Sequence, residues 1–215
     1  MTPDLFAQIL PLQDTGTPLF VLAVIAAYLI GCIPFAVVVS KAFGLADPRS
    51  FGSGNPGATN VLRTGNKLAA FLTLFGDAAK GAIAIGVAVL IGIPPDLLGW
   101  IGFIAFMGHL FPVTLGFKGG KGVSTSAGVL LALYWPLGLA TLTTWLLVAF
   151  TLRYSSLSAI TAALLTPAYA VFMGLPTPVI VPITLMVAVL LIKHAGNLRR
   201  LLAGQESKIG SKKKH

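Results

Sequence analysis

The sequence predicts an all-α integral membrane protein with about seven transmembrane helices, one of them short. Of its 215 residues, 56% are hydrophobic and only 10% are charged, whereas soluble domains usually carry about 25% charged residues. The mean hydropathy is +0.90. The apolar residues also come in runs close to the roughly 20 residues that a membrane-crossing helix needs. These observations exclude a soluble globular domain.

Seven apolar segments are candidate spans, and short polar loops separate them. The fourth has about half the usual length and ends at Tyr134, and the glycine-rich loop FKGGKG separates it from the third. The stretch from Leu97 to Leu152 is too long for one span, so the fourth and fifth segments count separately. The expected spans are Leu19–Val39, Leu68–Ile91, Leu97–Leu115, Thr125–Tyr134, Leu137–Leu152, Leu157–Met173 and Val179–Ile192.

The charged residues alternate between the two sides of the membrane. With the N-terminus outside, the outer loops carry only Asp4, Asp14 and Asp96, and every basic loop residue lies inside. Basic residues collect in cytoplasmic loops, which predicts an outside N-terminus and a cytoplasmic C-terminus. The net charge of +9 then reflects topology and anionic lipid, not nucleic-acid binding. The inside basic residues are Lys41, Arg49, Arg63, Lys67, Lys118, Lys121, Arg153, Lys193, Arg199, Arg200, Lys208 and Lys212–Lys214.

We expect one domain and no accessory group. Cys32 is the only cysteine, so the sequence predicts neither a disulfide framework nor a cysteine metal cluster. We also expect no obligatory protein partner. The predicted layout is a helical membrane domain at 1–200 with active-site loops at 44–66, 108–125 and 193–210, followed by a basic cytoplasmic tail at 201–215.

The first inside loop, FGSGNPGATNVLRTG, contains the G-x-G-x-x-G spacing of dinucleotide-binding proteins. It follows an apolar helix rather than a β-strand, and the acidic residue about 20 positions on, Asp77, lies in an apolar segment, so that function is excluded. The glycines still let backbone N–H groups approach an anion, and a helix start favours phosphate. The candidate substrate-binding residues are Ser53, Gly54, Asn55, Gly57, Thr59 and Arg63, with Asn60 expected to contribute to catalysis.

The second inside loop, GFKGGKG, presents two lysines between glycines. Lysine is a mobile point charge suited to phosphate, and a topology signal alone needs no glycines. Lys118, Gly119, Gly120 and Lys121 are therefore candidate site residues. His109, which precedes this loop, either supports a helix end or belongs to the site, and both alternatives stay open.

Ionisable residues also lie inside one span and after the last one. Asp77 and Lys80 are one turn apart in the second span. Charges are costly there unless paired, so we expect a buried pair that either organises the site or takes part in it. After the last span, His194 and Asn197 share a helix face with Arg200. His194 is the strongest candidate for a base that titrates near neutral pH.

In these segments the sequence resembles the bacterial acyl-phosphate:glycerol-3-phosphate acyltransferase family of the PlsY type. The similarity rests on GSGNPGATNVLRTG, GDAAKG, GHLFPVTLGFKGGKGVST and KHAGNLRRLLAGQESKIG, which together extend over nearly the whole chain. The family usually has a basic residue after the last histidine, whereas Ala195 and Gly196 follow here. The resemblance implies a seven-helix fold and acyl transfer from acyl phosphate to the sn-1 hydroxyl of glycerol 3-phosphate, with lysophosphatidic acid and phosphate as products. It also implies a bacterial inner membrane and no need for a cofactor or metal.

The residues favour direct attack by the glycerol hydroxyl, because no His-x4-Asp pair and no motif for a covalent acyl-enzyme is present. The first loop would hold one phosphate, while Lys121 neutralises the leaving group. His194 either removes the hydroxyl proton or holds a substrate phosphate that acts as the base, and Asn197 completes the site. Lys80 and His109 are further substrate-binding candidates. The expected partners are acyl phosphate, glycerol 3-phosphate and membrane lipid; the alternative function is transport of a phosphorylated solute or lipid.

Overall fold

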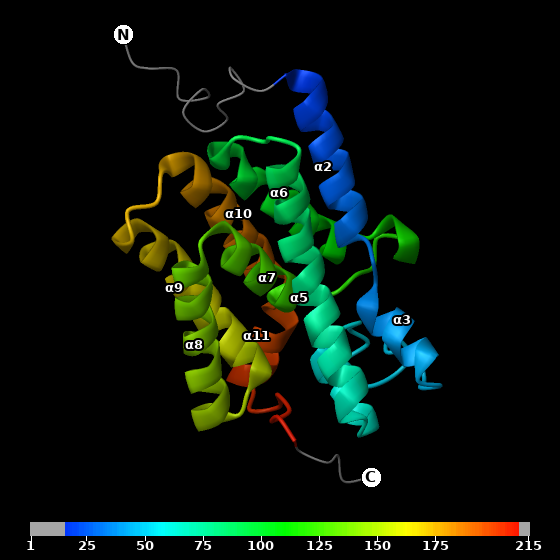
Figure 1. The fold of residues 1–215 in the computed structure, drawn as a ribbon. Coiled ribbons are helices and arrows are strands. Elements are labelled where there is room, and N and C mark those ends of the chain that lie inside the picture. Colours follow the sequence, from blue (N-terminus) through cyan, green and yellow to red (C-terminus); the bar gives the residue numbers. More distant parts are fainter. Residues whose placement is uncertain (1–15, 211–215) are drawn as a thin grey trace.

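The structure, a computed structural model, describes residues 16–210, and within that range the chain is a bundle of helices without a strand (Figure 1). The all-α prediction is confirmed for this range. The predictions for Asp4, Asp14 and the lysines of the last five residues lie outside the described residues. The elements are α2 (Thr17–Gly31), α3 (Phe35–Ala42), α4 (Ala58–Val61), η1 (Leu62–Thr64), α5 (Lys67–Leu90), α6 (Pro95–Leu110), η2 (Val113–Leu115), α7 (Val123–Leu133), α8 (Trp135–Leu152), α9 (Ser155–Phe172), α10 (Thr177–Lys193) and α11 (Ala195–Leu202).

The helix lengths support a multi-pass membrane protein. In the described chain, five helical stretches are long and apolar enough to cross a membrane, and α10 with α11 would make a sixth across a 54° bend. Helix α7 is apolar but shorter, in agreement with the short fourth span. The start of α2 and helix α11 lie at opposite ends of the bundle (Figure 1). Seven crossings and the orientation of the termini stay predictions.

The first predicted span is a broken helix rather than a continuous one. Helices α2 and α3 are separated at Pro34, and α3 packs against α5 (Figure 1). Proline lacks an N–H group and disfavours helical conformation in the residue before it. Side chains from other segments satisfy two carbonyl groups at the break: Lys80 Nζ donates to Ile33 O at 2.7 Å and Thr114 Oγ1 donates to Cys32 O at 2.8 Å.

Apolar packing places α5 and α6 at the centre of the bundle. Helix α5 packs against α7, and α6 packs against both α2 and α10. One core cluster surrounds Phe106 and Ile183, and a second surrounds Leu97. Large apolar side chains such as Phe150 and Phe172 are exposed on the outside, where a membrane protein meets lipid. Charged groups inside such a bundle therefore need an explanation of their own.

Candidate active site

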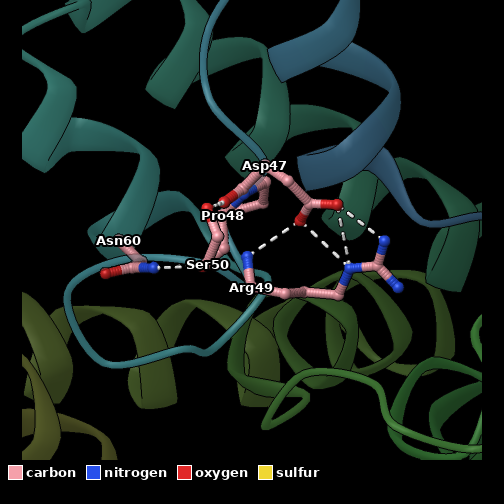
Figure 2. A network of polar contacts seen from close by, with 5 residues as sticks. All are labelled: Asp47, Pro48, Arg49, Ser50 and Asn60. Carbon is pink, nitrogen blue, oxygen red and sulfur yellow. Dashed lines mark hydrogen bonds and ion pairs between the residues drawn. The ribbon is translucent and has the colours of Figure 1, made fainter.

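The side chain of Asn60, on α4, shapes the first glycine loop (Figure 2). Its Nδ2 donates to Pro48 O at 2.7 Å and to Phe51 O at 3.1 Å, and its Oδ1 accepts from Ser53 N at 3.1 Å. Gly52 has φ +61°, and a Cβ there would lie 2.3 Å from Asn60 Oδ1. Asn60 is buried, and its amide group is engaged by the loop backbone. The sequence predicted a catalytic role; the structure places Asn60 as a support for the loop, and catalysis by it stays a prediction.

A turn at Asp47–Ser50 begins the same loop (Figure 2). Arg49 Nη2 lies 2.6 Å from Asp47 Oδ2, and the backbone N–H of Arg49 donates to Asp47 Oδ1 at 2.9 Å. Hydrogen bonds from the Arg49 side chain and backbone lower the pKa of Asp47. Ser50 Oγ closes the turn by donating to Asp47 O at 2.8 Å. The pair is solvent-exposed, so it contributes to the shape of the turn more than to overall stability.

The predicted binding residues of this loop lie at an accessible surface. Ser53, Gly54, Thr59 and Arg63 are exposed, and Asn55 and Gly57 are half-buried. Two of them reach other segments. Thr59 Oγ1 lies 3.2 Å from Ser155 Oγ at the start of α9, and Arg63 Nη2 donates to Ser207 Oγ at 2.8 Å. The first loop therefore meets α9 and the segment after α11 at one end of the bundle.

The second glycine loop folds back on the end of α6. Gly119 N donates to Leu110 O at 3.1 Å, and Gly120 N donates to His109 O at 3.2 Å. The loop delivers Lys121, whose Nζ donates to Asn197 Oδ1 on α11, while Lys118 is exposed. Burial lowers the pKa of Lys121; Glu206 opposes this effect, and the charges of Arg200 and Arg63 add to it.

Asn197 is held in turn by Glu206. Its Nδ2 donates to Glu206 Oε1 at 2.6 Å, Ser156 Oγ donates to the same oxygen at 2.7 Å, and Arg200 Nε donates to Oε2 at 2.6 Å. Because the amide N–H₂ of Asn197 faces the carboxylate, its oxygen is directed at Lys121. We call Lys121, Ser156, Asn197, Arg200 and Glu206 the end cluster.

Glu206 is an ionised member of this cluster. Burial raises the pKa of its carboxyl group, but hydrogen bonds from Asn197, Ser156 and Arg200 outweigh that effect, and the pKa is lowered overall. The segment that carries it is fixed to α8, because Ile209 N donates to Arg153 O at 2.6 Å and Arg153 Nη2 donates to Ile209 O at 3.0 Å. Residues 205–210 therefore belong to the site, and the predicted boundary at residue 200 falls inside α11.

His194 lies at the bend between α10 and α11 and is 3% exposed. Its Nδ1 lies 2.9 Å from Leu190 O. A carbonyl oxygen only accepts hydrogen bonds, so Nδ1 carries the proton of the neutral ring and Nε2 keeps its lone pair. The ring is fixed in orientation, with its accepting nitrogen left for another partner.

Lys80 and His109 lie apart from the end cluster, in the interior of the bundle. Lys80 Nζ is 2.8 Å from Asp77 Oδ1, and His109 Nδ1 is 3.4 Å from the same oxygen. The pairing of Asp77 with Lys80 confirms the prediction, whereas the addition of His109 was not expected. Both predicted substrate-binding residues are buried and already paired, which argues for support rather than direct substrate contact. We call Asp77, Lys80 and His109 the buried triad.

Three members of the end cluster were not predicted as site residues: Ser156, Glu206 and Arg200, which was noted only for sharing a helix face with His194 and Asn197. Ser156 carried no signal beyond its place near the start of a span. Glu206 did carry one, since it is the only acidic residue after Asp96 and lies in a strongly basic segment. Among residues 16–210, no group of three or more His, Cys, Asp or Glu side chains is arranged to hold a metal ion.

The comparisons with known proteins identify the family of this chain. The family model described as glycerol-3-phosphate acyltransferase matches residues 21–204. The chain belongs to the glycerol-3-phosphate acyltransferase family. It is 57% identical over 196 residues to the enzyme of that name from Burkholderia orbicola (strain MC0-3), covering 90% of this chain and 94% of the relative. The enzyme from Burkholderia cenocepacia (strain HI2424) is also 57% identical over 196 residues, covering 90% and 92%.

The acyltransferase fold is also found among solved structures. The crystal structure of PlsY, an integral membrane glycerol 3-phosphate acyltransferase, in its glycerol 3-phosphate form has a TM-score of 0.84 at 37% identity, covering 89% of this chain and 96% of that one. The lysophosphatidic acid form has a TM-score of 0.82 at 36% identity, covering 89% and 95%. The chain is therefore an integral membrane acyltransferase of glycerol 3-phosphate, and the transporter alternative is set aside.

Proposed function

We propose that this acyltransferase moves a fatty acyl group from acyl phosphate to the sn-1 hydroxyl of glycerol 3-phosphate at the cytoplasmic face of a bacterial inner membrane. One observation carries the proposal: Arg63, Lys121 and Arg200, from three separate segments, converge on the end cluster and residue Ser207 beside it. Two phosphate-bearing substrates need such a set of cations. The basic residues in the loops at this end of the bundle support the cytoplasmic side.

Each site residue then has a chemical task. Thr59 and Arg63, which are exposed at the first loop, bind one phosphate. Lys121 neutralises the phosphate that leaves the acyl carbonyl, and Asn197 holds Lys121 in place. The glycerol hydroxyl oxygen forms a bond to the acyl carbonyl carbon. The bond from that carbon to the phosphate oxygen breaks, and phosphate departs with the electron pair.

The hydroxyl proton passes to a substrate phosphate in our proposal. His194 is almost fully buried, and one ring nitrogen is bound to Leu190 O, which suits a group that accepts a hydrogen bond better than one that exchanges protons with a substrate. A His194→Gln variant keeps hydrogen-bonding capacity but cannot act as a base near neutral pH. We expect it to keep most of its activity. A loss of about 10²–10⁴-fold would instead show that His194 is the general base.

The acyl chain has an apolar place beside the end cluster. A groove of about 310 Å³ lies between α9 and α11, lined by Tyr154, Leu157, Leu198, Leu201 and Leu202, and Glu206 forms part of its wall. Apolar lining with a few polar groups at one end is typical of lipid-chain sites. We propose that the chain of acyl phosphate enters here with its carbonyl carbon at the end cluster.

The test uses the purified full-length protein in detergent with palmitoyl phosphate and glycerol 3-phosphate. We expect phosphate and lysophosphatidic acid to appear in equal amounts. A parallel reaction with palmitoyl-CoA should give no product. If a folded sample used palmitoyl-CoA but not palmitoyl phosphate, the proposed donor would be wrong, although the family assignment would stand.

A further inference from the structure

The buried triad is a charged structure in a place where charge is expensive. The Asp77 and Lys80 side chains are 3% and 2% exposed, and His109 is 8% exposed. Replacing a buried ion pair by apolar groups of similar volume is often neutral or stabilising, and the penalty for charge within a membrane protein is at least as high. A contribution to folding stability is therefore a poor explanation for the presence of these three charged or ionisable side chains in the core.

The triad contacts two other parts of the structure, the break between α2 and α3 and the second glycine loop. On one side, Lys80 Nζ donates to Ile33 O at the break between α2 and α3. On the other, the His109 ring lies directly against the backbone of Gly120, because a Cβ on that residue would be 2.2 Å from His109 Nε2. The backbone of the same two residues is joined as well, since Gly120 N donates to His109 O at 3.2 Å.

The His109 ring determines where the Gly120 backbone can lie. Because Gly120 immediately precedes Lys121, the ring also determines where Lys121 lies. His109 Nδ1 lies 3.4 Å from Asp77 Oδ1 on one side of the ring, while Nε2 lies against the glycine loop on the other. A loop of glycines has little conformational preference of its own. Contact with the His109 ring therefore restricts the backbone conformation of Gly119–Gly120, which the glycines alone would leave free.

We propose that Asp77, Lys80 and His109 are positioning residues for the acyl transfer, which act by fixing the Gly119–Gly120 backbone so that Lys121 meets the leaving phosphate. The proposal rests on the role of Lys121 given above. The triad itself does not touch substrate. Misplacing a catalytic group by about 1 Å costs roughly 10²-fold in rate, and this is the effect that the triad prevents.

A double-mutant cycle tests the coupling. His109→Leu is made in the wild-type and in the Lys121→Ala background, and kcat and KM are measured by phosphate release. We expect kcat/KM to fall by about 10²-fold in the wild type and by less than about 3-fold once Lys121 is absent, because coupled residues are non-additive. His109→Gln, which can still bond to Asp77, should recover part of the loss.

The matched control is Thr73→Ala. Thr73 is fully buried on the same helix as Asp77 and bonds only to Ala69 O of that helix, at 2.8 Å. Its effect should be equal in both backgrounds. An equal loss for His109→Leu in both backgrounds would overturn the proposal. If Lys121→Ala alone changed nothing, the assigned role of Lys121 would fail instead, and the two failures are distinguishable.

A second measurement is independent of catalytic rate and of how well one variant folds. Folded protein is treated briefly with acetic anhydride, and acetylation of Lys121 is measured relative to the exposed Lys67 by mass spectrometry. His109→Leu and the charge-removing pair Asp77→Leu/Lys80→Met should both raise the Lys121 ratio severalfold, while Thr73→Ala should not. An unchanged ratio in a folded triad variant would show that the triad does not position Lys121.

Discussion

The buried triad and the end cluster contain similar side chains in opposite settings. In the triad, a lysine and a histidine share one carboxylate, and all three are almost completely enclosed. In the end cluster, Asn197 joins Lys121 to Glu206, while Arg200 donates directly to Glu206 and is exposed. The triad lines a cavity of only about 10 Å³, about the space of one water molecule and too small for a phosphate group. The end cluster has accessible cations around a set of hydrogen bonds that a ligand could exchange.

In our proposal, burial rather than residue type separates the supporting side chains from those that bind substrate. Lys80 and Lys121 were both candidate ligands for phosphate on sequence grounds. The ammonium group of Lys80 is paired with Asp77 and donates to a backbone carbonyl. Lys121, by contrast, is only half-buried and donates to the uncharged amide of Asn197. A charged substrate gains most from a cation that is not already neutralised.

The largest expected effect comes from removing a cation of the end region. Lys121→Ala or Arg63→Ala should lower kcat/KM by about 10²–10³-fold, because each removes a charge-stabilising donor from the developing phosphate. Phosphate release from palmitoyl phosphate measures it. Lys67→Ala, which removes an exposed lysine at the start of α5, is the control. Equal losses for Lys67 and Lys121 would mean that only overall charge matters.

The contact between the two regions is tested by Gly120→Ala. The added Cβ would meet His109 Nε2 at 2.2 Å, so either the ring or the loop must move. We expect kcat/KM to fall by roughly 10²-fold while the protein still folds. Gly86→Ala is the matched control, since a Cβ there meets no atom within 4 Å. Full activity of Gly120→Ala would show that the loop tolerates displacement.

A smaller effect is expected in the acyl groove. Leu201→Trp should narrow the space between α9 and α11 and change the ratio of kcat/KM for palmitoyl and lauroyl phosphate by about 10-fold, in favour of the shorter chain. Leu147→Trp, on the exposed face of α8, should leave that ratio unchanged. An unchanged ratio in both variants would place the acyl chain elsewhere.

The smallest effect concerns stability and pH. The pKa of Glu206 is lowered from 4.5 in the folded protein, so its ionised form stabilises the fold above the unfolded value, and this contribution is lost as pH falls through the lower folded-state value. Melting temperatures of the wild type and Glu206→Gln in detergent measure it. The wild type should melt higher at neutral pH, by about 2–4 °C for each kcal/mol, and the gap should close below pH 4.5. A difference in melting temperature that did not change with pH would show that the size and hydrogen bonds of the Glu206 side chain, rather than its charge, stabilise the fold.

Features that depend on neighbouring residues in the chain were predictable. The apolar runs predicted the helices, and the glycine-rich segments predicted the loops that carry Lys121 and Arg63. The one-turn spacing predicted the Asp77–Lys80 pair. The break at Pro34 was missed, although proline carried the signal. The capture of His109 by that pair was not predictable, because nothing local relates the end of α6 to the middle of α5.

The sequence by itself therefore determined the class of molecule, its helices and the side chains available for phosphate chemistry. These follow from hydropathy, charge and backbone preference, which act over short stretches of chain. Only the tertiary structure decided which charges are enclosed and which are accessible. It brought Glu206 into hydrogen-bond contact with Asn197 and directed the side chain of Asn60 to the backbone of its own loop. The physical reason is that burial and hydrogen-bond partnership depend on which distant segments pack together, and those contacts turn similar side chains into either support or binding site.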